Sequence, residues 1–177
     1  MANILSPAIA NFVAGNSILN DVKYGALYKV VGDNMSITSA NQALNNVIAL
    51  GVIDSGAILD KLIFYNDTAL DTNGSPTLTV DIGLYTMDVV GNLTAVSAAC
   101  YSSASTAIRA ANATGVDLMT ANGAAVTSAT VLTTAASIAG VSPDPVKQYV
   151  IGLKIHAAAA TAAATVPCAW KIVTIKN

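Results

Sequence analysis

Residues 66–85 read NDTALDTNGSPTLTVDIGLY, a polar stretch that leads directly into a strictly alternating one. In the second half, Leu78, Val80, Ile82 and Leu84 alternate with smaller or polar residues. A period of two places one set on each face of an extended chain, which predicts a half-buried β-strand. The first half combines Asn, Asp, Gly, Ser and Pro, each of which favours turns for its own physical reason. The stretch therefore predicts a turn that leads into a strand.

Asp67, Asp71 and Asn73 allow a second interpretation of the polar half. The D-x-N-G fragment at 71–74 has the residue types of part of a calcium-binding loop. Such a loop also needs further oxygen ligands, including a bidentate carboxylate, and the chain contains no glutamate. We therefore expect a turn that needs no metal or other cofactor, and a calcium site at these three residues is the alternative.

Alternation and strand-length apolar runs recur along the chain. They occur at VKYGALYKVV (22–31), SIT (36–38), NVIALGVI (46–53), AILDKLIFYND (57–67), QYVIGLKI (148–155) and CAWKIVTIK (168–176). With the strand at 77–84 they give at least seven strand candidates. We expect 57–67 to form a hairpin with 77–84, and 148–155 to form one with 168–176.

Alanine-rich segments compete with this pattern. Residues 157–165 read AAAATAAAT, but they lie between two alternating segments and lack capping residues, so we expect a loop there. Short helices are predicted at about 104–112 and about 133–139, the second ending at Gly140. Closely spaced strands without a βαβ rhythm then predict an all-β fold, an antiparallel β-sandwich with one or two short helices in its loops.

The composition indicates an assembly component. Of the 177 residues, 54% are hydrophobic and only 10% are charged, against roughly 25% charged in an average soluble domain. Such a surface is difficult to cover without copies of itself or a partner. A net charge of −2 with scattered lysines provides no basic stripe for nucleic acid. The uncharged interval 118–143 is rich in Thr, Ser, Asn and Gly, so we expect no membrane span.

Residues 1–21 form a separate N-terminal arm in this interpretation, and residues 22–177 form a single domain. The segment from 1 to 20 carries no charged side chain, and it lacks the basic start of a secretory signal. Its large apolar residues are our interface candidates: Ile4, Leu5, Ile9, Phe12, Val13, Ile18 and Leu19. We expect a neighbouring subunit or another partner to cover them, because burial offsets the entropy of ordering an irregular segment. The alternative is an arm folded back on its own sandwich.

Signals of catalysis are sparse. His156 is the only histidine, and the sequence contains no zinc motif, phosphate-binding loop or nucleophile elbow. We therefore expect no enzyme activity, and we expect Cys100 and Cys168 to be reduced structural thiols. Two roles are open for the aromatic residues, either a sugar-binding face or core and interface anchors. These residues are Trp170 and the tyrosines at 24, 28, 85, 101 and 149.

Three segments in this order resemble the head decoration proteins of tailed bacteriophages. They are the strand LTVDIGLY at 78–85, a short helical segment opened by an aromatic residue at 101–111, and a closing hairpin with an Ala/Thr-rich loop at 149–175. The resemblance covers most of the chain after about residue 22, and none of its motifs is catalytic. It implies a jelly-roll fold and a virion structural protein attached outside a capsid shell.

The resemblance implies a decoration or cement protein that binds the outer surface of a phage head and stabilises contacts between capsid subunits. Its partners would be the major capsid protein and other copies of itself, with a trimer as the expected oligomer. It would be made in the host cytoplasm and reside on the virion. The alternative from a different class is a carbohydrate-binding jelly-roll module of a phage tail or fibre.

Overall fold

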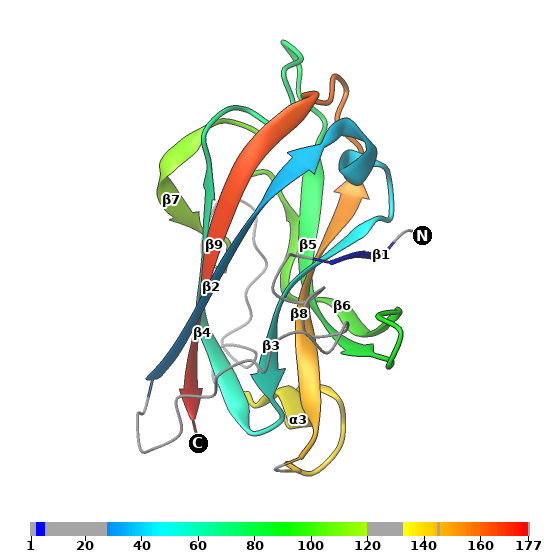
Figure 1. The fold of residues 1–177 in the computed structure, drawn as a ribbon, viewed down its shortest axis with the longest axis vertical. Coiled ribbons are helices and arrows are strands. Elements are labelled where there is room, and N and C mark those ends of the chain that lie inside the picture. Colours follow the sequence, from blue (N-terminus) through cyan, green and yellow to red (C-terminus); the bar gives the residue numbers. More distant parts are fainter. Residues whose placement is uncertain (1–2, 6–27, 120–132, 145, 177) are drawn as a thin grey trace.

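The computed structural model describes residues 3–5, 28–119, 133–144 and 146–176. These residues form two β-sheets packed face to face (Figure 1). Sheet A has the strand order β1-β3-β8-β5-β6, and sheet B has the order β2-β9-β4-β7. The strands are β1 (Asn3–Leu5), β2 (Tyr28–Thr38), β3 (Val47–Asp54), β4 (Ala57–Asn66), β5 (Thr79–Met87), β6 (Leu93–Ser105), β7 (Asn112–Asp117), β8 (Gln148–Ala157) and β9 (Thr165–Lys176). The predicted all-β sandwich is confirmed, and β1, which pairs in parallel with β3, is an addition to it.

The strand connectivity is that of a jelly roll. From β2 onward, every connection passes from one sheet to the other except the β5–β6 hairpin, which stays within sheet A. The strands β2 to β9 therefore interleave into two four-stranded antiparallel sets, the eight-stranded arrangement that defines this architecture. One consequence is that the loops 39–46, 67–78, 106–111 and 158–164 all lie at the same end of the sandwich (Figure 1).

Both predicted hairpins are wrong. The segment 57–67 contains β4 of sheet B, whereas 77–84 lies in β5 of sheet A, so the two do not pair. In the same way β8 belongs to sheet A and β9 to sheet B. Alternation fixes which side chains face the core, but it does not fix which strand is the partner. The connecting loops cross the sandwich between the two sheets.

One of the two predicted helices is confirmed. The helix α3 (Ala135–Ile138) begins after Thr134, whose side chain accepts a hydrogen bond from the Ser137 N–H, and Gly140 follows it with a φ of 68°. A 3₁₀ helix, η1 (Ser39–Gln42), had no counterpart in the prediction.

The helix predicted at 104–112 is wrong, because that segment completes β6, turns and begins β7. The Asn112 side-chain amide donates to the carbonyls of Ala107 and Ala110, at 2.9 and 2.8 Å. The Asn66 side chain donates to the Ala110 carbonyl as well, at 2.7 Å. These side-chain hydrogen bonds hold the segment in a turn despite the helical propensity of its alanines.

The main core lies between the two sheets and is centred on Trp170. The Trp170 ring stacks on Phe64 with ring centroids 6.1 Å apart and an interplanar angle of 7°. Its indole Nε1–H donates a 2.7 Å hydrogen bond to the carbonyl of Leu50, next to an irregularity in the pairing of β3 with β8. Trp170 is on sheet B and Leu50 is on sheet A, so this bond joins the two layers across the core.

A second apolar cluster covers the outer face of sheet A. It comprises Val47, Ala49, Val52, Tyr85, Leu93 and Val150, with Met87 and Ala98 packed against it. The central strands β3, β5 and β8 are consequently buried on both faces for most of their length. The segment 77–84 was predicted to be a strand buried on one face, and the structure shows that most of it is buried on both faces.

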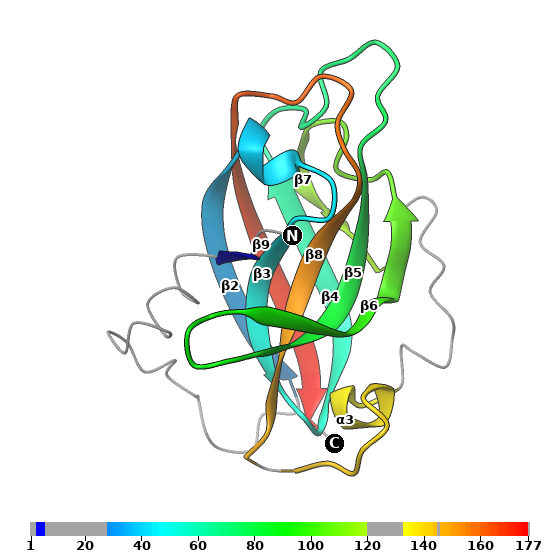
Figure 2. The same cartoon turned by 90° about the vertical axis from the view of Figure 1, so that its right-hand side faces the viewer.

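The cover is provided by the β5–β6 hairpin, which crosses in front of β8 and β3 (Figure 2). Strand β6 leaves the regular ladder here, since Ile82 pairs with Ser102 but Leu84 pairs with Ser97. Two glycines allow the close approach. A side chain at Gly83 would overlap the backbone of Ala98, and one at Gly152 would lie 2.5 Å from the Tyr85 ring.

We predict that Gly83→Ala destabilises the fold by about 1–3 kcal/mol or more, because the added methyl group meets backbone atoms that cannot rotate away. Gly56→Ala is the matched control, since nothing lies within 4 Å of a side chain added there. Chemical unfolding of both variants measures the difference. Equal stability of the two variants would contradict the close approach of β6 to β5.

Candidate interaction surfaces

Asp71 ties together the loops at one end of the sandwich. Its carboxylate accepts five backbone hydrogen bonds: from Asn73, Thr77 and Leu78 in its own loop at 3.2, 2.8 and 3.1 Å, and from Ala160 and Thr161 in the loop 158–164 at 3.0 and 3.1 Å. The same two loops are also paired through their backbones, with Asp71 opposite Ala162. The Asp71 carboxylate therefore fastens two crossover loops that are about ninety residues apart in the sequence.

The environment of Asp71 favours its ionised form. Burial alone would raise the pKa of this carboxyl, but the N–H groups of Thr161, Leu78, Ala160 and Thr77 outweigh it and hold the pKa well below its usual range. A charged carboxylate that accepts several backbone N–H groups is strongly stabilised even where solvent is excluded.

The three residues of the calcium alternative are engaged differently from one another. Both carboxylate oxygens of Asp71 already accept hydrogen bonds from backbone N–H groups. The Asn73 side chain accepts from Ser75 N–H at 2.8 Å and donates to the Thr161 hydroxyl at 3.0 Å, and Asp67 is exposed. Across the described ranges, no group of three or more His, Cys, Asp or Glu side chains could hold a metal ion.

His156 pairs with a buried aspartate on the outer face of sheet A. Its Nδ1 lies 2.9 Å from Asp81 Oδ2, and the other carboxylate oxygen accepts a 2.8 Å hydrogen bond from the Ala104 N–H. His156 itself is about half exposed, so its ring covers the carboxylate. This contact gives the single histidine a structural partner, and the absence of enzyme activity stays a prediction.

The two cysteines are free thiols, as predicted. Burial raises the pKa of Cys100 to about 11 and that of Cys168 to about 12, so both are protonated at neutral pH.

Of the two roles left open for the aromatic residues, the positions of most of them fit core anchors better than a sugar-binding face. Trp170, Tyr85, Tyr101 and Tyr149 are all buried. Tyr28 is exposed, and Tyr24 lies outside the described residues.

The arm residues are only partly described. Ile4 and Leu5 lie in β1, which pairs with Ile48 and Ala49 of β3 in the same chain. This pairing ties residues 3–5 to their own sandwich, as in the folded-back alternative. The remaining candidates, Ile9, Phe12, Val13, Ile18 and Leu19, lie outside the described residues.

None of the helices in the described segments has the length and apolar character to cross a bilayer.

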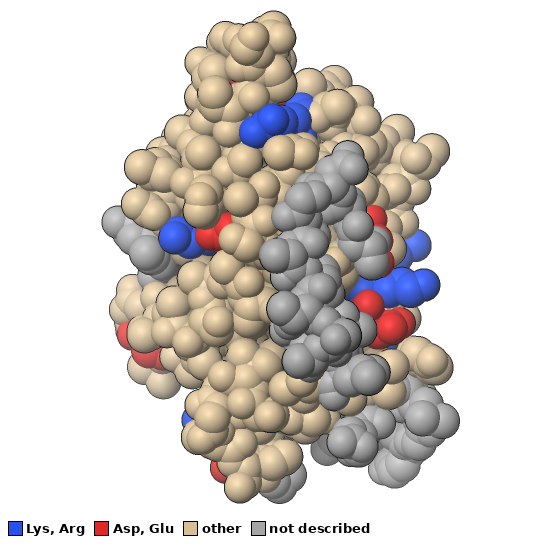
Figure 3. All heavy atoms as spheres, turned by 180° about the vertical axis from the view of Figure 1, so that it is seen from behind, with Lys and Arg blue, Asp and Glu red and all other residues tan. Residues whose placement is uncertain are grey.

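The surface carries few charges but two notable groups of exposed apolar side chains. Figure 3 shows Lys, Arg and Asp at scattered positions on the back of the molecule. One apolar group is the hairpin tip, Val89 and Val90, between β5 and β6. The other is the sheet B patch, formed by the exposed Tyr28 and Val30 of β2 and their partly exposed Cα partners on β9, Ile175 and Val173. Neither group was predicted as a unit, although Tyr28 was named as a possible interface anchor and the valine pair inside the turn DVVGN at 88–92 was a visible signal.

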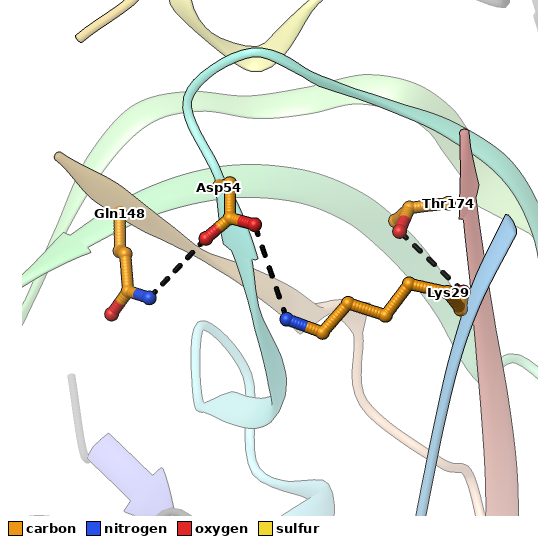
Figure 4. A network of polar contacts seen from close by, with 4 residues as sticks. All are labelled: Lys29, Asp54, Gln148 and Thr174. Atoms are coloured by element: carbon orange, nitrogen blue, oxygen red, sulfur yellow. Dashed lines mark hydrogen bonds and ion pairs between the residues drawn. The ribbon is translucent and has the colours of Figure 1, made fainter. Parts of the chain in front are cut away.

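A polar network links the two sheets beside the sheet B patch (Figure 4). Lys29 Nζ of β2 lies 3.9 Å from Asp54 Oδ2 of β3, and the Gln148 side-chain amide donates to Asp54 Oδ1 at 3.3 Å. The Thr174 hydroxyl donates to the Lys29 carbonyl at 3.5 Å. The Lys29 and Asp54 side chains are partly exposed, so their ion pair adds little stability, but it gives the charge of Lys29 a partner within the same chain.

Comparisons with known proteins give a structural match only. The sequence matches neither a model of a known protein family nor a curated protein. The fold matches a chain of the structure described as "Capsid of Ralstonia phage GP4", with a TM-score of 0.68 and 23% identity over 99% of both chains. It also matches a chain of "Cyanophage Pam1 capsid asymmetric unit", with a TM-score of 0.55 and 20% identity over 92% of this chain and 96% of that one. The fold of this chain is thus one that occurs in phage capsids.

We predict that Asp71→Asn destabilises the protein at neutral pH by about 2–4 kcal/mol, because an amide cannot accept all five hydrogen bonds and turns its own N–H groups toward other donors. Because the pKa of Asp71 is lowered by folding, its contribution is present above the unfolded value of about 3.9 and is lost as the pH falls below it. The stability gap between wild type and variant should therefore narrow in acid.

Urea unfolding at several pH values measures this gap, with Asp67→Asn, an exposed residue of the same loop, as the control. A chelator should leave the melting temperature of the wild type unchanged, because backbone groups satisfy the loop. A constant gap at all pH values, or a large effect of chelation, would contradict the assignment of Asp71 as a loop anchor.

Proposed function

We propose that this chain is a virion structural protein of the decoration or cement type, which binds the outer surface of a phage head. The observation that carries the proposal is the match, over 99% of both chains, to a chain of a phage capsid structure. The decoration role is favoured by the sequence resemblance to head decoration proteins, which rests on residues 78–85, 101–111 and 149–175. In this proposal the major capsid protein and other copies of the chain, as a trimer, are its partners, and it is made in the host cytoplasm.

The mechanism we propose is mechanical. A rigid body that touches several capsid subunits adds contacts that all have to break before the shell can open, so many weak contacts act together. The described fold provides the required rigidity, since Asp71 fastens two loops at one end and the β5–β6 hairpin covers one sheet. A surface with few charges suits broad apolar contacts with neighbouring subunits.

The N-terminal arm belongs to the same proposal. We propose that the arm residues after β1 add to attachment on a neighbouring subunit or on the shell, because their apolar side chains gain more from burial at an interface than from exposure.

The test is to add the purified chain to phage heads that lack it. We expect saturable binding in a fixed ratio to the capsid subunit, and a higher temperature for DNA release from the decorated heads. Heads that already carry the chain are the control and should bind no more. Failure to bind, or binding without any change in the release temperature, would contradict a cementing role.

A further inference from the structure

The loop between β5 and β6 is a rigid turn held by Asp88. The Asp88 Oδ1 atom accepts from the N–H groups of Val90 and Asn92 at 3.0 and 2.8 Å, and the Asn92 amide donates to Oδ2 at 2.8 Å. The Asp88 N–H and the Asn92 carbonyl close the loop at 3.0 Å, and Gly91 takes a φ of 88°. The side-chain and backbone hydrogen bonds from Asn92 lower the pKa of Asp88, so the loop carries a negative charge at neutral pH.

This turn presents two valines to solvent. Val89 is 91% exposed and Val90 is 70% exposed, so neither contributes measurably to the core. Because the loop is already ordered by Asp88, little conformational entropy would be lost when its tip is buried by a partner. A rigid apolar projection of this kind is suited to anchor a protein contact.

The chain also carries a surface that is complementary to this tip. In the sheet B patch, Tyr28 is 58% exposed and Val30 is 61% exposed, and both lie on the outer face of the sheet. Two exposed lysines border the patch on the same face: Lys61 is the Cα partner of Val173, and Lys171 is two residues before Val173 on β9. An apolar surface with a positive border matches an apolar tip with a negative base.

We propose that the hairpin tip, Val89 and Val90, of one copy docks on the sheet B patch of a second copy, together with the neighbouring Asp88. The valines then cover Tyr28 and Val30, and Asp88 lies near Lys61 and Lys171. Lys29 takes no part, because its charge is paired with Asp54. The tip extends from the sheet A side and the patch is on the outside of sheet B (Figure 1). The tip of one copy therefore cannot contact the patch of the same copy.

The contact is head-to-tail, with different surfaces on the two copies. Such contacts produce a ring when the rotation between copies closes, and each tip in the ring is then occupied. This inference rests on the self-association within the proposed function and identifies the residues that would provide it.

The first test replaces the tip valines with serine. We expect the double variant Val89→Ser, Val90→Ser to self-associate at least about tenfold more weakly than the wild type, since two valines lose their burial. Light scattering over a concentration series measures this. The matched control is Val141→Ser, Val146→Ser, two exposed valines at 44% and 86% on the loop before β8, which should associate normally. An unchanged tip variant, or a wild type that stays monomeric, would overturn the inference.

The second test uses cross-linking. Mild oxidation of a mixture of Val89→Cys and Val30→Cys chains should give a disulfide-linked pair, and Val89→Cys alone should give very little. Efficient cross-linking of Val89→Cys alone would show a tip-to-tip contact and overturn the inference. A tip variant that self-associates normally but fails to bind phage heads would place the tip on the capsid. That result would overturn this inference while leaving the proposed function standing.

Discussion

The architecture depends on the close approach of the β5–β6 hairpin to the outer face of sheet A. This approach is possible because Gly83 and Gly152 have no side chains where Ala98 and Tyr85 lie against the sheet. One sheet is thereby buried on both faces by a single chain. The second cluster buries part of the 54% hydrophobic composition within the monomer. The valine tip and the sheet B patch are apolar groups that remain at the surface.

Much of the fold could be predicted from local pattern, and the partners of each strand could not. Alternation located the strand at 77–84, strand-length apolar runs located those at 46–53 and 57–67, and Gly140 marked the end of the helix α3. Alternation specifies a face, however, and a jelly roll places successive strands in different sheets. The failure at 104–112 has the same origin, since the amides that hold that turn come in part from Asn66, far away in the sequence.

Asp71 shows how a turn can be recognised from the sequence while the distant groups that hold it cannot. The turn chemistry around it was visible in the sequence, and so was the fragment typical of a calcium loop. The groups that decide between the two are the N–H groups of Ala160 and Thr161, which only the folded chain brings to the carboxylate. The jelly roll makes this contact possible by gathering its crossover loops at one end.

The central claim is that this rigid jelly roll belongs to the outside of a phage head. The most direct measurement is electron cryo-microscopy of purified particles from a phage that encodes the chain, with its copies identified by mass spectrometry of the same particles. The account predicts density for the two-sheet sandwich on the outer surface of the head, in contact with more than one capsid subunit. Density only in the tail or inside the shell, or the absence of the chain from the particles, would contradict it.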